Sequence, residues 1–89
     1  MDQNLSEVPQ EEITQFHRYI GQRVKHYRQK HKISQLQMAL SLGIKSVAFY
    51  SNCENSKLDK HFNVEHLYKI CKVLDITLSE FFQEPTAEN

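Results

Sequence analysis

The sequence predicts an all-α fold in a single domain of five helices. Apolar residues recur at spacings of three and four along most of the chain, which is the period of a helix with one buried face. Only two glycines and two prolines are present, so the turns that a strand-and-hairpin pattern needs are scarce. With 89 residues we expect one compact core. We expect a mobile acidic stretch over residues 1–8, the domain over 9–83 and a disordered tail over 84–89.

The first helix is expected to start after Pro9 and to end near residues 30–32. Glu11 and Glu12 lie near its start, where acidic side chains face the positive end of the helix dipole. Gly21 lies inside the helix at a cost of about 1 kcal/mol relative to alanine, which indicates close packing of another helix. The apolar face of this helix is formed by Ile13, Phe16, Ile20, Val24 and Tyr27.

Two short helices joined by a turn are expected next. Ser34 is expected to cap the second helix, with Gln37 three residues later as in a capping box. Gly43 ends that helix in the position of a left-handed cap. The third helix is expected over about residues 45–55. Two short helices joined by a turn with glycine form a helix-turn-helix arrangement, here over about residues 34–55.

A polar, basic loop over residues 56–62 is expected before the fourth helix. Asn63 is expected to cap that helix, and Asp75 to end it. Thr77 then caps a short fifth helix of sequence LSEFF. The apolar face of the fourth helix is formed by Val64, Leu67, Ile70, Cys71, Val73 and Leu74.

Positive charge is concentrated in the middle of the chain, although the whole chain has a net charge of zero. Residues 13–60 contain nine lysines and arginines against two acids, a net charge of +7, and the other acids lie before and after this stretch. Such asymmetry indicates a polyanionic partner. A solvated basic helix face is the alternative, and it explains the first six of these charges better than the later three.

No residue pattern indicates a membrane segment, a metal site, a cofactor or an enzyme. No apolar run approaches the length of a membrane span, and the polar, acidic N-terminus is unlike a targeting peptide. The histidines lack the spacing of metal ligands, and no nucleophile is paired with a base. Cys53 and Cys71 fit two small buried side chains in a reducing cytoplasm, with a disulfide or redox switch as the alternative.

Two stretches of the chain, IGQRVKHYRQKHKISQLQMALSLGI and VEHLYKICKVLDITLSEFF, resemble parts of a known family. The first is similar to the opening, and the second to the closing helices, of the lambda-repressor-like helix-turn-helix family of the Cro and phage-repressor (Xre) type. Together with the segment between them, the resemblance covers roughly residues 20–82. It implies a fold of five helices with the second and third as the DNA-binding pair, here with an N-terminally extended first helix.

The resemblance also implies roles for individual residues. Gln35 corresponds to a glutamine that contacts backbone phosphate. Arg28 and Glu54 correspond to a buried ion pair that ties the first helix to the end of the recognition helix. Ala39 and Gly43 correspond to the small residue of the second helix and the glycine of the turn.

The third helix can be aligned with the family in two ways, because the family usually has one residue fewer after the turn glycine. Anchoring on Glu54 buries Tyr50 and leaves the extra residue near residues 44–46. Anchoring on Gly43 instead buries Asn52 and loses the glutamate. We prefer the first alignment because it keeps the ion pair.

In this alignment the outer face of the third helix offers side chains to base edges in the major groove. The candidates for these contacts are Lys45, Ser46, Val47, Ala48, Ser51 and Asn52. The candidates for phosphate contacts are Arg23, Gln35, Lys57 and Lys60. Asn52 can bond an adenine edge through both ends of its amide. Few of the others select a base by hydrogen bonding, so the shape of the DNA is expected to contribute.

The predicted function is a sequence-specific regulator of transcription, a repressor that binds an inverted-repeat operator in double-stranded DNA as a homodimer. Leu78, Phe81 and Phe82 are the candidate dimer residues, although Phe81 and Phe82 could instead close the monomer core. The alternative is an antitoxin or protein-interaction module that binds a toxin or other protein, with weak or no DNA binding. The zero net charge and the near-neutral third helix favour this alternative somewhat. The expected location is the cytoplasm, at the nucleoid, for a bacterial or phage protein.

Overall fold

The computed structural model describes residues 7–83, and over this range the chain forms five helices and no strand. The helices are α1 (Gln10–Lys30), α2 (Gln35–Ser41), α3 (Val47–Asn55), α4 (Val64–Leu74) and α5 (Leu78–Phe82). The predicted all-α fold and its five helices are confirmed. The tail expected at residues 84–89 lies outside the described residues, as do residues 1–6 of the mobile stretch expected at residues 1–8. None of the described helices is both long and apolar enough to cross a bilayer.

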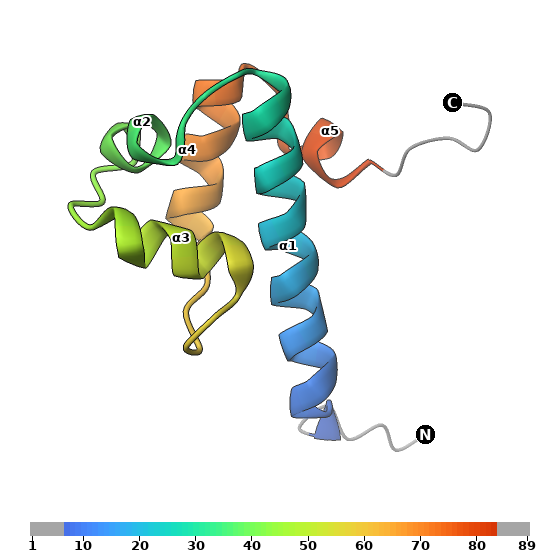
Figure 1. The fold of residues 1–89 in the computed structure, drawn as a ribbon. Coiled ribbons are helices and arrows are strands. Elements are labelled where there is room, and N and C mark those ends of the chain that lie inside the picture. Colours follow the sequence, from blue (N-terminus) through green and yellow to red (C-terminus); the bar gives the residue numbers. More distant parts are fainter. Residues whose placement is uncertain (1–6, 84–89) are drawn as a thin grey trace.

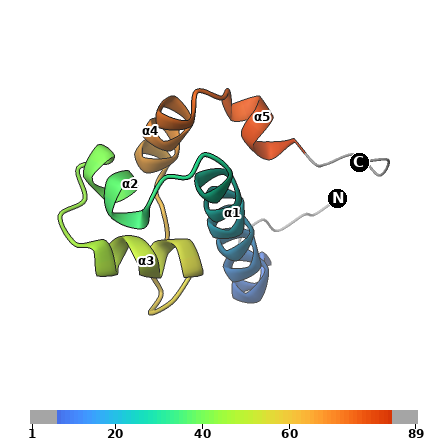
Figure 2. The ribbon, with the colours of Figure 1, turned by 45° about the horizontal axis from the view of Figure 1, so that its top comes forward.

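The helices are arranged around α1. Figures 1 and 2 show α2 and α3 on one side of α1 and α5 on the other. Helix α4 contacts α1, α2 and α5, and so links the two sides. The N-terminal half of α1 extends past the other helices (Figure 1).

Four of the five helices start at a side-chain cap. The side chains of Ser34, Asn63 and Thr77 each accept a hydrogen bond from the backbone amide three residues later, and their own backbone amides each donate one to that residue's side chain, as in a capping box. Ser46 caps α3 by accepting a bond from the amide of Phe49. Such caps stabilise a helix by about 1 kcal/mol each, so the helix starts depend on local sequence.

Four helices end at, or just before, a residue in the left-handed region, which for α1 is Lys32 with φ of 58°. Gly43 follows α2 with φ of 78°, and the predicted left-handed turn is confirmed. Ser56 and Asp75 adopt the same conformation at the ends of α3 and α4, with φ of 55° and 58°. Residues other than glycine rarely adopt it, because the Cβ approaches the following carbonyl oxygen.

The core is built from side chains of all five helices and of the loop before α4. Its buried apolar residues are Ile20, Val24, Met38, Ala39, Leu42, Tyr50, Cys53, Phe62, Ile70, Cys71, Leu74 and Phe81. Phe62 corrects the expectation of a wholly polar loop: it is 6% exposed, and its ring lies against Tyr50 at 5.4 Å between centroids. The assignment of Val64 and Val73 to the apolar face of α4 was wrong. Val64 is 85% exposed because α4 begins there, beyond the core, and Val73 is also exposed.

The apolar face predicted for α1 is buried only in its C-terminal part. Ile20 and Val24 are in the core, whereas Ile13 and Phe16 are exposed because this end of α1 extends past the other helices. Gly21 is in contact with the end of α3: an added Cβ would overlap the carbonyl oxygen of Glu54. The predicted close packing at Gly21 is therefore confirmed, and only a residue without Cβ permits it.

Candidate nucleic-acid interface

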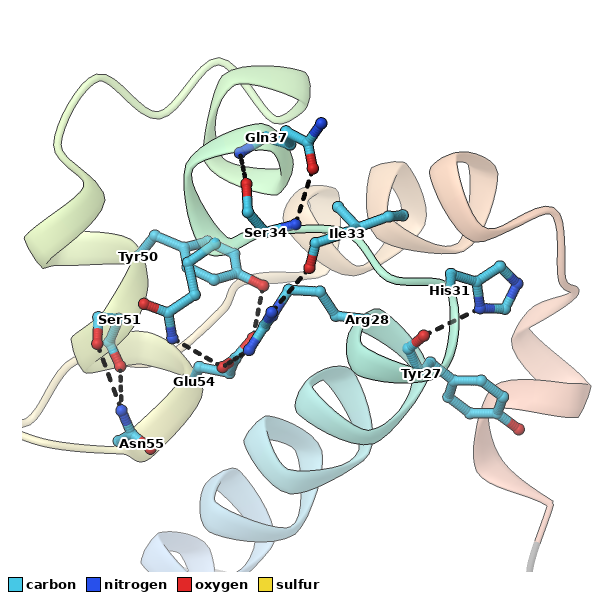
Figure 3. A network of polar contacts seen from close by, with 11 residues as sticks. Tyr27, Arg28, His31, Ile33, Ser34, Gln37, Tyr50, Ser51, Glu54 and Asn55 are labelled. Atoms are coloured by element: carbon cyan, nitrogen blue, oxygen red, sulfur yellow. Dashed lines mark hydrogen bonds and ion pairs between the residues drawn. The ribbon is translucent and has the colours of Figure 1, made fainter.

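A buried carboxylate joins the three N-terminal helices. Glu54 is 2% exposed, and its two oxygens accept four hydrogen bonds (Figure 3). Arg28 donates from Nε to Oε2 at 2.7 Å and from Nη2 to Oε1 at 3.0 Å. Tyr50 donates from its hydroxyl to Oε2 at 2.7 Å, and Gln35 from Nε2 to Oε1 at 3.0 Å. These residues come from α1, α2 and α3, so the carboxylate fixes these helices relative to one another.

The hydrogen bonds keep the buried Glu54 ionised. Burial alone would raise the pKa of its carboxyl, but the hydrogen bonds from Arg28, Tyr50 and Gln35 outweigh burial and hold the pKa below its usual range. The hydrogen bonds that Arg28 donates to Glu54 raise the pKa of the guanidinium. Burial raises the pKa of the Tyr50 hydroxyl, which is therefore a hydrogen-bond donor at neutral pH.

Arg28 also holds the connection between α1 and α2. Its Nη1 donates to the backbone oxygen of Ile33 at 2.8 Å (Figure 3). The guanidinium thus uses its planar set of donors on both the carboxylate and the backbone, which a lysine could not do. Through these bonds Arg28 contacts both the segment just before α2 and the C-terminal part of α3.

Helix α3 has one buried and one open face. Tyr50, Cys53 and Glu54 are buried. This pattern agrees with the alignment that anchors the helix on Glu54. Burial raises the pKa of the Cys53 thiol to about 11. The candidates Lys45, Ser46, Val47 and Ala48 are exposed, and Ser51 and Asn52 are half-buried. The open face is therefore formed by the first turn of α3 and by the residues one turn later.

Asn55 belongs to the same open face and was missed by the sequence reasoning. It is exposed, and its Nδ2 donates to the backbone oxygen of Ser51 at 3.0 Å and lies 3.4 Å from the Ser51 hydroxyl (Figure 3). The signal was its position four residues after Ser51, which places both side chains on one face of a helix.

The structure gives Arg23 a different role from the predicted phosphate contact. Its Nε donates to the backbone oxygen of Phe81 at 2.7 Å and its Nη2 to that of Gln83 at 2.7 Å. The guanidinium also lies over the rings of Tyr19 and Tyr27, at 5.9 and 5.4 Å from their centroids. Arg23 therefore binds the C-terminal end of α5, on the opposite side of α1 from α3, and we withdraw it as a DNA contact.

Lys57 and Lys60 lie in the segment between α3 and α4, residues 56–63, which we call the 56–63 loop. Lys57 and Lys60 are exposed. The amide of Lys57 donates to the backbone oxygen of Asn52 at 2.8 Å, and the amide of Lys60 to that of Lys57 at 2.9 Å. Lys57 is thus attached to the end of α3 by a backbone hydrogen bond, and Lys60 is bonded to Lys57 within the loop.

The candidate dimer residues divide into two groups. Phe81 is fully buried and closes the core of the monomer, so it is not available to a second chain. Leu78 and Phe82 are 44% and 38% exposed. Phe82 also lines an apolar cavity of about 400 Å³ between α1, α4 and α5, together with Phe16, Ile20, Phe62, Val64 and Leu67.

The chain matches a known protein family. A family model described as helix-turn-helix matches residues 24–81. The chain belongs to this helix-turn-helix family. Its match covers α2 and α3, the Arg28–Glu54 pair and most of α5, and it agrees with the Cro-type resemblance of the sequence. Neither a curated protein nor a solved structure matched the chain.

Membership of this helix-turn-helix family gives the general function. Its domains bind double-stranded DNA, and the chain is a DNA-binding regulator in this general sense. The family is not typically enzymatic. Within residues 7–83, no group of three or more histidine, cysteine, aspartate or glutamate side chains is placed to hold a metal ion. Cys53 and Cys71 are both free thiols.

Proposed function

We propose that the protein is a sequence-specific repressor of transcription that places the start of α3 in the major groove of its operator. The observation that carries this proposal is the division of α3 into two faces. Tyr50 and Glu54 hold one face in the core, while Ala48 and its neighbours leave the other face open. A helix in this arrangement can enter the groove without losing its packing.

The open face suggests a division of roles among its residues. The methyl groups of Val47 and Ala48 suit the methyl group of thymine, and Asn52 suits the N6 and N7 edge of adenine. Lys45 is exposed just before the helix and can reach a phosphate or a guanine. The side-chain amide of Asn55 is hydrogen-bonded to Ser51, so these two polar side chains lie together beside Asn52. The set contains few strong donors, so DNA shape contributes to the choice of site.

Phosphate contacts on this proposal come from the residues that flank α3. Lys57 and Lys60 extend from the 56–63 loop at the end of α3. Gln35 is half-buried at the start of α2, and one hydrogen of its Nε2 is bonded to Glu54. A side-chain amide has two such hydrogens, so the second is left for a phosphate. Contacts of this kind set the orientation of the protein on the duplex.

A homodimer on an inverted repeat is part of the proposal. Two small domains on one operator make the contacts that a single domain lacks. The exposed side chains of Leu78 and Phe82 supply an apolar surface for a second copy, and this surface continues into the cavity beside Phe16. The same cavity favours the second candidate function, an antitoxin or interaction module, in which a partner protein covers it.

Footprinting of the purified chain on the DNA upstream of its own gene tests the proposal. We expect a protected inverted repeat, with an affinity that falls steeply as salt rises, because bound lysines release counterions from phosphate. Lys57→Gln and Lys60→Gln should each reduce the slope of log affinity against log salt by about 1. Lys72→Gln is the matched control, since Lys72 is exposed on α4 beside Tyr68 and lies outside the proposed surface.

Two results would contradict the repressor proposal. One is binding without a protected site, at an affinity that is the same for every sequence. The other is stable co-purification with a second protein and no retention on DNA at low salt, which supports the interaction module instead.

A further inference from the structure

Two histidine rings stack between α1 and the 56–63 loop. His17 and His61 are nearly parallel, with an interplanar angle of 8° and 3.7 Å between ring centroids. His17 lies in the N-terminal half of α1, before the part of the chain that matches the family model. His61 directly follows Lys60, one of the proposed phosphate contacts. The stack therefore joins the part of α1 that precedes the family match to the 56–63 loop, which carries the proposed phosphate contacts.

The surroundings of His17 favour its neutral form. Its Nδ1 is buried and has no hydrogen-bond partner among the described residues. In the imidazolium form both ring nitrogens carry hydrogen. The Nδ1–H of the charged ring would then be a buried donor with no acceptor. An unpaired donor of this kind is unfavourable in a folded protein. The neutral ring avoids it by leaving Nδ1 unprotonated.

Among residues 7–83, the charged side chains that line the cavities beside the stack belong to the loop. A second cavity, of about 320 Å³, is lined by both histidines, by Asp59 and Lys60 of the loop, and by the neutral residues Ser56, Gln10, Ile13 and Thr14. On the other side, α4 and α5 contribute the uncharged Val64, Leu67 and Phe82, and the titratable His66 of α4 contacts the ring of Phe62. Burial and the neighbouring His61 lower the pKa of His17, and Asp59 opposes this only in part.

The 56–63 loop has an unfavourable backbone that contacts outside it must hold in place. Ser56, Leu58 and Asp59 all have positive φ, between 54° and 58°. Leu58 is 76% exposed, so its side chain does not hold the loop by packing. The loop is attached to α3 by backbone bonds from Ser56 and Lys57, and to α4 by the capping bonds of Asn63. The buried Phe62 attaches it to the core, and the histidine stack attaches it to α1. Backbone strain of this kind persists only where the surroundings impose it.

We propose that the His17–His61 stack is a pH-sensitive contact that holds the 56–63 loop against α1 when its rings are neutral and releases the loop when both are protonated. Two positive rings in face-to-face contact repel each other, and the buried Nδ1–H of His17 has no acceptor. Opening the stack exposes both rings to water and removes one of the attachments of the strained loop. The groups that change charge are the two imidazoles, each of which gains one proton.

The sign of the pH dependence follows from His17. Because its pKa is lowered in the folded protein, the folded state binds fewer protons than the unfolded state. The contribution of the stack is therefore complete above the usual histidine pKa of 6.5 and is lost as the pH falls below it. The lowered pKa of His66, which is due first to burial, acts in the same direction but on the start of α4.

Nuclear magnetic resonance of the full chain between about pH 7.5 and pH 5, on either side of the ordinary histidine pKa, tests the proposal without DNA. We expect the ring protons of His17 and the amides of the 56–63 loop to shift with one shared midpoint. The amide of Lys60, which is bonded to Lys57, should exchange at least about tenfold faster at the acid end after correction for intrinsic exchange. The amides of α3 should keep their protection.

Two variants separate the stack from general acid effects. His17→Phe and His61→Phe each keep an aromatic ring in the contact but cannot take up a proton, so loop exchange should no longer change with pH. His61 is exposed, so His61→Phe serves if His17→Phe does not fold. His26→Gln, which removes an exposed histidine from the same helix, should behave as the parent. The proposal is overturned if the loop amides of the parent do not respond to acid, or if both phenylalanine variants respond as the parent does.

The consequence for DNA rests on the proposed function and is measured separately. If Lys57 and Lys60 contact phosphate, the salt slope of the parent should become shallower at acid pH, and that of His17→Phe should not. Loop release without any change in the slope would leave the pH-sensitive contact standing and contradict the phosphate role of these lysines.

Discussion

The hydroxyl of Tyr50 donates a 2.7 Å hydrogen bond to Oε2 of Glu54, one helical turn later on α3. The same oxygen accepts from Nε of Arg28, so the tyrosine completes the set of donors around a buried charge. The position of α3 depends on this carboxylate as well as on apolar packing. The first two predictions follow from this dependence.

Replacing the carboxylate should destabilise the fold strongly. Glu54→Ala leaves the Arg28 guanidinium buried without its partner, and we expect a loss of about 3–5 kcal/mol in the free energy of unfolding. Tyr50→Phe removes one donor only and should lose about 1–3 kcal/mol. Urea denaturation measures both. Glu65→Ala, which breaks the exposed pair with Lys69, should change little. If Glu54→Ala melts like the parent, the network does not hold the helices together.

The same carboxylate should make stability depend on acid pH. The pKa of Glu54 is lowered in the folded protein, so its contribution is complete above the usual value of 4.5 and is lost as the pH falls through the folded pKa. Glu54→Gln keeps the shape but not the charge. The difference in unfolding free energy between the parent and this variant should therefore be largest near neutral pH and shrink below pH 4.5. A difference that stays constant down to acid pH would show that the ionised form is not favoured by folding.

Gly21 offers a test of the contact between α1 and α3. Helix propensity alone predicts that Gly21→Ala stabilises by about 1 kcal/mol. Because the new Cβ would overlap the backbone at Glu54, we expect instead a loss of about 1–3 kcal/mol, as for other overpacked sites. Gln22→Ala, at the next and exposed position, is the control. A stabilised Gly21→Ala variant in urea denaturation would mean that the helices are further apart than described.

Arg23 and Lys60 should give opposite results in two measurements. Arg23→Gln removes the bonds to the end of α5, so it should lower the unfolding free energy and leave the salt slope of DNA binding unchanged. Lys60→Gln should lower the salt slope and leave stability unchanged, because Lys60 is exposed. A reduced slope for Arg23→Gln, at a temperature where it is fully folded, would restore Arg23 to the DNA surface.

Features set by neighbours in the sequence could be predicted from it. Ser34 with Gln37 and Thr77 with Glu80 form their caps within three residues, so the helix starts follow from residue types alone. The burial of Tyr50 is predicted once α3 is aligned on Glu54, and that alignment rests on the resemblance to the family.

Features set by distant contacts could not be predicted. Arg23 has the residue type and position of a phosphate contact, but its partners are backbone oxygens of Phe81 and Gln83, which no side-chain pattern records. Phe62 stands in a polar stretch and is buried only because the loop turns its ring towards Tyr50. The stack of His17 on His61 likewise depends on how the loop returns to α1.

Selection of bound duplexes from a random pool tests our claim that the open face of α3 reads base sequence. The parent should enrich an inverted repeat with an adenine preference at one position of each half-site. Asn52→Ala removes the amide and with it about 1–3 kcal/mol of discrimination between adenine and the other bases at that position. The rest of the motif should remain. Lys72→Gln, the control, should enrich the same motif as the parent. Enrichment of the same motif by the parent and by Asn52→Ala, or no motif for the parent, would contradict the claim.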